Sequence, residues 1–260
     1  MADLRPITLI TGASVGIGAA LARVFAANGH ATVLVARREQ LLANLAEEIA
    51  ATGAPRPVVL RADLGSIDAA SRIGEQLTAL DLEPEFVVNN AGFGLVGPAA
   101  ELSRAEQLAM IDLNVRALTD LSLAWVDALA RHRGGILNVA SVAAFLPGPG
   151  MAVYYASKAY VLSFSEALHQ ELAPRGVRVT ALCPGPVPTE FQERAGVKDL
   201  KYPRALTRSP ERVAEEGYRA LKEGRRVVVP GFANQLVTQL VGFFPRKLVL
   251  NAMAARNRRD

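Results

Sequence analysis

The sequence predicts an α/β protein built on a doubly wound parallel sheet with helices on both faces. Short β-branched runs alternate with longer amphipathic segments along most of the 260 residues, and parallel strands need helical crossovers of that length. The expected strands are continuous apolar runs, as in PITLI and ATVLVA, which is typical of strands buried on both faces. Right-handed crossovers from the first strand make such a sheet doubly wound.

The ends of several elements are also visible in the sequence. Gly29 follows an amphipathic segment and is a natural helix stop. Ser103 and Glu106 form a capping box that opens a long helix, and Ser66 is the expected cap of the helix after the third strand. We expect strands at 6–10, 31–36, 57–62, 85–92, 134–141, 177–185 and 226–230. We expect the longer helices at 16–28, 40–52, 103–131, 152–173 and 210–223.

The composition fits one soluble globular domain. Half of the residues are hydrophobic and 21% are charged, which is ordinary for such a domain, and the length suffices for one large core. The start does not have the pattern of a signal peptide, and no run approaches the ~18 apolar residues of a membrane span. The single cysteine, Cys183, excludes an intrachain disulfide and favours a reducing compartment, so the cytoplasm is the expected location.

The charge is distributed unevenly. Residues 225–260 carry seven basic side chains and one acidic one, a net charge of +6; the whole chain carries +4, so the remainder carries −2. A nearly neutral body argues against a nucleic-acid-binding face. Three scattered histidines and one cysteine lack the spacing of metal ligands, so we expect no structural metal.

The octet TGASVGIG at residues 11–18 is compatible with two kinds of chemistry. Its GASVG core matches the G-x-S-x-G elbow, in which a serine, here Ser14, is the nucleophile. The same turn could instead hold the pyrophosphate of a dinucleotide. Gly12 would allow the sharp turn, Gly16 a close backbone approach and Gly18 tight helix packing, and the positive helix end would face the phosphates.

The end of the second strand indicates which dinucleotide would bind there. An NAD site usually places an acidic residue about 20 positions after the last glycine of the turn. Here Arg37 follows Gly18 by 19 residues, with Arg38 beside it. A guanidinium can bind a phosphate through two hydrogen bonds, so these arginines favour NADP(H) over NAD(H).

Tyr154 and Lys158 are the strongest candidates for catalysis. Their i,i+4 spacing places them on one face of the helix expected at 152–173. A nearby ammonium favours phenolate, which lowers the tyrosine pKa from about 10 toward neutrality and makes the phenol a usable proton donor or acceptor. Ser141 precedes Tyr154 by 13 residues at a strand end, so the two hydroxyls can converge on one substrate oxygen.

Together these segments resemble the short-chain dehydrogenase/reductase family. The resemblance covers residues 7 to about 190, although the glycine spacing departs from the general G-x-G-x-x-G fingerprint. It implies a Rossmann-type seven-stranded sheet in the order 3-2-1-4-5-6-7. We expect one dinucleotide-binding and catalytic domain at 1–231 and an amphipathic helical extension at 232–260. The motifs that carry the resemblance are TGASVGIG, Asp63-Leu64, NNAG at 89–92, Asn114, Ser141, YYASK at 154–158 and PGPVPT at 184–189.

The resemblance also implies roles for these residues. Tyr154 would protonate the substrate oxygen while Ser141 donates a hydrogen bond to it, and Lys158 would hold the nicotinamide ribose. The main chain of Asn114 would hold a water that links Lys158 to solvent. The expected catalytic residues are Asn114, Ser141, Tyr154 and Lys158. The expected cofactor-binding residues are Gly12, Ser14, Val15, Gly16, Ile17, Gly18, Arg37, Arg38, Asp63, Leu64, Asn90, Ala91, Gly92, Tyr154, Lys158, Pro184, Gly185, Val187 and Thr189. Of these, Asp63 would lie near the adenine, and Thr189 would bind the nicotinamide carboxamide or a phosphate.

Two other functions fit parts of the sequence. A hydrolase elbow at Ser14 would need earlier strands, an upstream oxyanion loop and a later acid and histidine, whereas His132 and His169 fall within expected helices. A non-catalytic dinucleotide-sensing protein on the same fold would be expected to lose the proton donor, which is present here. We therefore predict an oxidoreductase that transfers hydride between NADP(H) and a carbonyl or secondary alcohol, with the sensor as the alternative.

The substrate is less visible in the sequence. Phe93, Val142, Phe145 and Met151 are expected to line an apolar pocket, which favours a 3-oxoacyl or steroid-like ketone. The segment 190–208 is long for a connection between a strand and a helix and is the expected lid.

The extension at 232–260 carries an apolar stripe that Pro245 divides into two expected helices. These helices could cover the pocket, form a subunit interface, or dock onto an anionic membrane through the stripe and the basic end. By the resemblance, the helices at 103–131 and 152–173 would join subunits into a homodimer or homotetramer.

Overall fold

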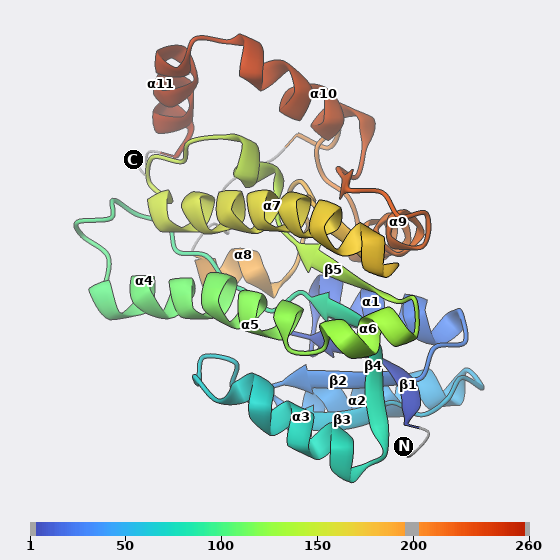
Figure 1. The fold of residues 1–260 in the computed structure, drawn as a ribbon. Coiled ribbons are helices and arrows are strands. Elements are labelled where there is room, and N and C mark those ends of the chain that lie inside the picture. The colour runs from blue at the N-terminus through green and yellow to red at the C-terminus, as the bar shows by residue number, and fades with distance from the viewer. Residues whose placement is uncertain (1–3, 196–202, 258–260) are drawn as a thin grey trace.

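The chain folds around one seven-stranded parallel sheet (Figure 1). The computed structural model describes residues 4–195 and 203–257. The strand order is β3-β2-β1-β4-β5-β6-β7, and every neighbouring pair is parallel, which confirms the predicted fold class. The strands are β1 (Arg5–Thr11), β2 (Thr32–Ala36), β3 (Val58–Arg61), β4 (Leu82–Asn89), β5 (Gly135–Val139), β6 (Arg178–Leu182) and β7 (Val227–Val228).

Helices bury both faces of this sheet. Leu9 and Ile10 are consecutive, yet they belong to separate apolar clusters on opposite faces, because side chains alternate along a strand. This double burial explains the continuous apolar runs of the sequence. One face is covered by α1 (Gly16–Ala27), α2 (Glu39–Ala51) and α9 (Pro210–Lys222). The other is covered by α3 (Ala69–Ala79), α5 (Leu118–Leu123), α6 (Val126–Arg131) and α7 (Ala152–Leu172).

The segment expected as one helix at 103–131 is divided into four pieces. Its start is as predicted, since the Ser103 hydroxyl accepts a hydrogen bond from the Glu106 amide. Helical periodicity in a sequence does not reveal a π turn, which adds one residue per turn, nor the non-helical backbone of Trp125. The pieces are α4 (Arg104–Ile111), the π-helix η1 (Asp112–Ala117), α5 and α6.

Several other boundaries differ from the expectation. Ser66 does not cap α3, which begins after Asp68. The Ser66 hydroxyl instead donates a hydrogen bond to the Asp68 carboxylate. β4 begins at Leu82 and ends at Asn89, because the next residues turn toward β1 instead of continuing the ladder. β7 has only two residues, at the edge of the sheet.

The last part of the chain lies apart from the sheet, at the top of Figure 1 beyond α7. α11 begins directly after Pro245, as predicted. Of the expected lid at 190–208, residues 196–202 lie outside the described part of the chain. Across residues 4–195 and 203–257, every helix is too short or too polar to cross a bilayer. The remaining elements are η2 (Val142–Phe145), η3 (Ala173–Arg175), α8 (Glu190–Ala195), α10 (Phe232–Leu240), η4 (Val241–Phe243) and α11 (Arg246–Asn257).

Candidate active site

The glycine turn between β1 and α1 has a conformation that only glycine adopts easily. Gly12 and Gly16 have φ values of +64° and +59°, in the left-handed region. A Cβ atom on Gly18 would lie 2.3 Å from the Gly12 carbonyl oxygen, so α1 could not pack this closely with any other residue. The residue before the helix, Val15, gives no side-chain cap to its first amides. These amides and the positive helix end are therefore suited to an anion.

The NNAG segment fixes this turn to the sheet. Asn90 Nδ2 donates to the carbonyl oxygens of Thr11 and Gly12, at 3.0 and 3.1 Å. Asn89 is buried and donates to Ser122 Oγ and Asn138 Oδ1, both at 2.9 Å. The two asparagines thus hold β1, β4, β5 and α5 in register at the carboxyl edge of the sheet.

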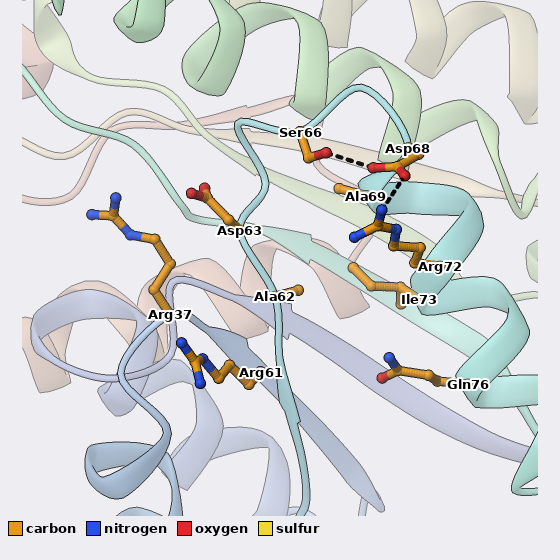
Figure 2. Close-up of a pocket in the computed structure, with 10 residues that line it drawn as sticks. All are labelled: Arg37, Arg61, Ala62, Asp63, Ser66, Asp68, Ala69, Arg72, Ile73 and Gln76. Atoms are coloured by element: carbon orange, nitrogen blue, oxygen red, sulfur yellow. Dashed lines mark hydrogen bonds and ion pairs between the residues drawn. The ribbon is translucent and has the colours of Figure 1, made fainter.

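A cavity of about 470 Å³ opens beyond β2 and β3. Figure 2 shows Arg37 and Arg61 on one side of this cavity, with Asp63 nearby, and Arg72, paired with Asp68 on the same helix, on the opposite side. Within the described ranges neither Arg37 nor Arg61 has an ion-pair partner. Two guanidinium groups without ion-pair partners in the described part of the chain therefore line one cavity. The sequence analysis did not predict Arg61 as a site residue, because only its place at a strand end distinguishes it.

Arg38 has a different environment from Arg37. It donates to Glu190 Oε2 at 2.8 Å and to Ser14 Oγ at 3.1 Å. This side chain therefore joins the glycine turn to α8. The two neighbouring arginines, which the sequence treats alike, point to different parts of the site because successive residues after a strand leave on different sides.

The PGPVPT segment after β6 returns to the glycine turn. A Cβ atom on Gly16 would lie 2.9 Å from Thr189 Cγ2, and one on Gly185 would lie 2.5 Å from Asn234 Nδ2. Asn234 is buried in α10 and donates to the carbonyl oxygens of Leu206 and Pro230. It is a positioning residue that sequence reasoning missed, because nothing in its local pattern distinguishes it from a surface asparagine.

Lys158 and Asn114 meet below the NNAG turn. A Cβ atom on Gly92 would lie 2.9 Å from Asn114 Oδ1 and 3.6 Å from Lys158 Nζ. Lys158 is 6% exposed, and its ammonium donates to the Val139 carbonyl at 2.7 Å. Burial lowers the pKa of Lys158 to about 8, because the charged form loses its water.

Asn114 connects the π-helix to the catalytic helix. Its amide pairs with the backbone of Phe93 in both directions, at 2.9 and 3.1 Å, and donates to Ser157 Oγ at 3.1 Å. Ser157 in turn donates to the Tyr154 carbonyl at 2.7 Å. Ser157 was missed by the sequence analysis, although it lies within YYASK.

Ser141 and Tyr154 stand at the end of β5 and near the start of α7. Ser141 Oγ accepts a hydrogen bond from the Ala143 amide at 3.1 Å, and the Val142 amide donates to the Pro184 carbonyl at 3.0 Å. These bonds fix the strand end beneath α7. The Tyr154 ring packs against Phe191, with centroids 5.5 Å apart.

The surroundings of Tyr154 are apolar. Met151, one of the four residues expected to line the pocket, belongs to its cluster. Phe145 packs instead against a different cluster that contains Val161, and Phe93 is buried with its backbone held by Asn114. Phe191, which lies in the segment 190–208 expected as the lid, also belongs to this cluster. The sequence missed Val96, which comes from a distant segment, and Tyr155, the neighbour of Tyr154.

The three histidines are all engaged away from Ser14. His30 bonds with Tyr218, His132 with Glu83, and His169 with the Val179 carbonyl. A serine nucleophile needs a histidine or another base within hydrogen-bond reach, and Ser14 has Arg38 there. The hydrolase interpretation is therefore excluded.

Comparison with known proteins identifies the family. Residues 6–199 match the short chain dehydrogenase family. Sulfoacetaldehyde reductase 2 of Chromohalobacter salexigens is 39% identical over 191 residues, 72% of this chain and 75% of that protein. A short-chain dehydrogenase from Sphingobium yanoikuyae in complex with NADPH has a TM-score of 0.81 at 31% identity, covering 95% of this chain and 96% of that one. The bulky-bulky ketone specific alcohol dehydrogenase from Comamonas testosteroni has a TM-score of 0.76 at 28% identity, covering 93% and 94%.

The chain therefore belongs to the short-chain dehydrogenase/reductase family, and it is an oxidoreductase that acts on alcohol or carbonyl groups. The predicted family and enzyme class are confirmed.

Proposed function

We propose that the protein is an NADP(H)-dependent reductase of apolar ketones that also oxidises the corresponding secondary alcohols. The observation that carries the cofactor assignment is the cavity beyond β2 and β3, where Arg37 and Arg61 face a common space without ion-pair partners among the described residues. A 2′-phosphate is the group that distinguishes NADP from NAD, and it complements such a pair.

The site fits a dinucleotide along its whole length. The uncapped amides of α1 suit a pyrophosphate, Asp63 lines the cavity where the adenine end would lie, and Thr189 stands beside the glycine turn. When bound, the cofactor supplies or accepts the hydride at the substrate carbon. The relative solved with NADPH supports the same cofactor for this chain.

Residues of the protein transfer the proton to or from the substrate oxygen. Tyr154 donates it to the oxygen of a ketone, and Ser141 stabilises the charge that develops on that oxygen. Lys158, with a pKa of about 8, is still mostly protonated at pH 7 and favours the phenolate form of Tyr154. Asn114 holds α7 to the turn at Phe93, which keeps these groups in position.

The apolar cluster around Tyr154 supports a ketone substrate with bulky hydrocarbon groups. The ketone-specific relative from Comamonas testosteroni agrees with this substrate class. Sulfoacetaldehyde, the substrate in the name of another relative, is small and anionic, and an apolar lining does not favour it.

We further propose that the enzyme is a cytoplasmic homodimer or homotetramer. Leu108 on α4, Leu123 on α5 and Tyr160 on α7 are exposed, and these helices lie together at the front of Figure 1. Replacing Leu108 and Leu123 by Glu would then lower the mass measured by light scattering, whereas an unchanged mass would remove these helices from the interface.

The test of function is a fluorescence titration with NADPH and NADH, followed by a substrate panel. We expect the wild type to prefer NADPH by about tenfold or more and Arg37→Asp to lose this preference, because a carboxylate repels the 2′-phosphate. Arg56→Asp, outside the cavity, is the matched control. Equal affinity for both cofactors would overturn the assignment. Turnover of sulfoacetaldehyde but not of aryl or alkyl ketones would overturn the substrate class.

A further inference from the structure

We propose that the C-terminal arm, residues 232–257, docks the enzyme onto an anionic lipid surface. The arm consists of α10, η4 and α11. Its apolar side chains would enter the interface of the bilayer and its basic side chains would meet lipid phosphates. This inference goes beyond the proposed function, since it does not depend on which substrate or cofactor is used.

The first observation is that α10 is amphipathic with its polar side turned inward. Asn234 is 3% exposed and donates to Leu206 and Pro230, and Gln235 Nε2 donates to the Val229 carbonyl at 3.0 Å. The outward side carries Phe232, which is 76% exposed, and Leu236 and Leu240 one and two turns later. A helix on a globular protein normally shows the opposite arrangement.

The second observation is the corner between α10 and α11. Phe243 is 84% exposed and Phe244 is 57% exposed, and both lie between α10 and α11. The next residues after Pro245 are Arg246 and Lys247, which are also exposed. Aromatic side chains beside cations match the boundary between lipid tails and headgroups.

The third observation is the sign of the charge. Residues 232–257 contain no aspartate and no glutamate, and residues 225–260 carry +6 while the remainder carries −2. An arm that was only solvated would be expected to carry both signs. Each basic residue near an anionic leaflet adds roughly fivefold to the affinity.

A second copy of the chain is a weaker candidate for this surface. A two-fold interface brings the same patch of both subunits together, so the basic residues of two arms, Arg246 and Lys247 among them, would share one interface with no acidic residue of either arm to neutralise them. The helices expected to join subunits, α4, α5 and α7, carry exposed apolar residues of their own.

The test is co-sedimentation of the full-length enzyme with vesicles of phosphatidylcholine, with or without phosphatidylglycerol. We expect binding to the mixed vesicles that exceeds binding to pure phosphatidylcholine by about tenfold or more, and that falls at 1 M NaCl because salt screens the attraction. Equal binding to both vesicles, or none to either, would overturn the proposal.

Two double variants locate the binding surface. We expect Phe243→Ser/Phe244→Ser and Arg246→Glu/Lys247→Glu each to reduce binding by about tenfold or more while NADPH affinity stays unchanged. The matched controls are Leu80→Ser, an exposed apolar residue on α3's end, and Arg104→Glu/Arg219→Glu, which makes the same change in charge elsewhere. Binding that survives both arm variants would overturn the proposal. Sedimentation velocity gives a second check. If only the phenylalanine variant formed a smaller oligomer than the wild type, the arm would be a subunit interface and the proposal would be overturned.

Discussion

At the scale of single residues, burial sets the chemistry of Lys158. Its ammonium donates to the Val139 carbonyl and lies close to Asn114 and the NNAG turn, so burial removes most of the water that would stabilise its charge. The pKa of about 8 means that folding imposes a cost on the charged form. The same position that lets this lysine act on Tyr154 therefore reduces stability at neutral pH.

The pH dependence of stability tests this point. The unfolded lysine has a pKa near 10.5 and the folded one near 8, so between these values the unfolded state binds more protons and stability rises with pH. We expect the wild type to gain up to ~3 kcal/mol relative to Lys158→Met between pH 8 and pH 10.5. Urea unfolding of both proteins at several pH values measures it. A difference that stays constant with pH would contradict the lowered pKa.

Tyr154 is expected to be the proton donor. Tyr154→Phe keeps the ring packing against Phe191 but removes the proton, so turnover should fall by about 10²–10⁴-fold while the Kd of NADPH is unchanged. Tyr155→Phe is the matched control, since this neighbouring ring belongs to the same apolar cluster. Steady-state kinetics on a ketone measure both. A loss in Tyr155→Phe equal to that in Tyr154→Phe would assign the effect to packing.

At the scale of elements, two short departures from regular structure position the site. The π-helix η1 (Asp112–Ala117) interrupts a helix and turns Asn114 toward Phe93 and Ser157. The glycine turn lets α1 start within contact distance of β1. The π-helix thereby directs the Asn114 amide into the site, and the glycine turn leaves the first amides of α1 free to bind an anion.

The packing of α1 on the glycine turn can be tested by adding one methyl group. Gly18→Ala would place Cβ 2.3 Å from the Gly12 oxygen and 2.4 Å from Asn90 Nδ2, so we expect ~1–3 kcal/mol of destabilisation and weaker NADPH binding. Gly74→Ala is the control, because its Cβ would meet only Trp125 at 3.8 Å and alanine favours a helix by up to ~1 kcal/mol. Denaturant unfolding compares the two. Equal stability would show that α1 can shift without cost.

At the scale of the whole molecule, the C-terminal arm is connected to the cofactor side of the sheet through Asn234. This residue holds Leu206 and Pro230 and fills the space beside Gly185. α10 also contacts η2, which follows Ser141. An enzyme docked through the outer side of the arm would therefore bring the substrate end of its site near the lipid, which suits an apolar ketone.

The connection through Asn234 predicts a measurable loss of stability. Asn234→Ala leaves two carbonyl oxygens without their donor, so we expect ~1–3 kcal/mol of destabilisation together with weaker NADPH binding. Gln239→Ala, at an exposed position of the same helix, should change neither. Thermal unfolding with and without NADPH measures both effects. If Asn234→Ala changed neither stability nor NADPH affinity, the arm would not help to position the segment around Gly185.

Much of this architecture was predictable because it depends on local sequence patterns. Continuous apolar runs separated by amphipathic segments require a parallel sheet buried on both faces, and the i,i+4 spacing of Tyr154 and Lys158 places them on one helical face. Gly12 and Gly16 were predictable for the same reason, since a turn with positive φ requires glycine.

Other features depend on contacts between distant segments, and only the tertiary structure decided them. Arg37 and Arg38 are equivalent in the sequence, yet one faces a cavity with Arg61 and the other is bound by Ser14 and Glu190. The lowered pKa of Lys158 follows from its burial among distant segments, and the outward apolar side of α10 follows from the carbonyl oxygens to which Asn234 donates. In each case the deciding partners are far apart along the chain, so no local pattern could contain them.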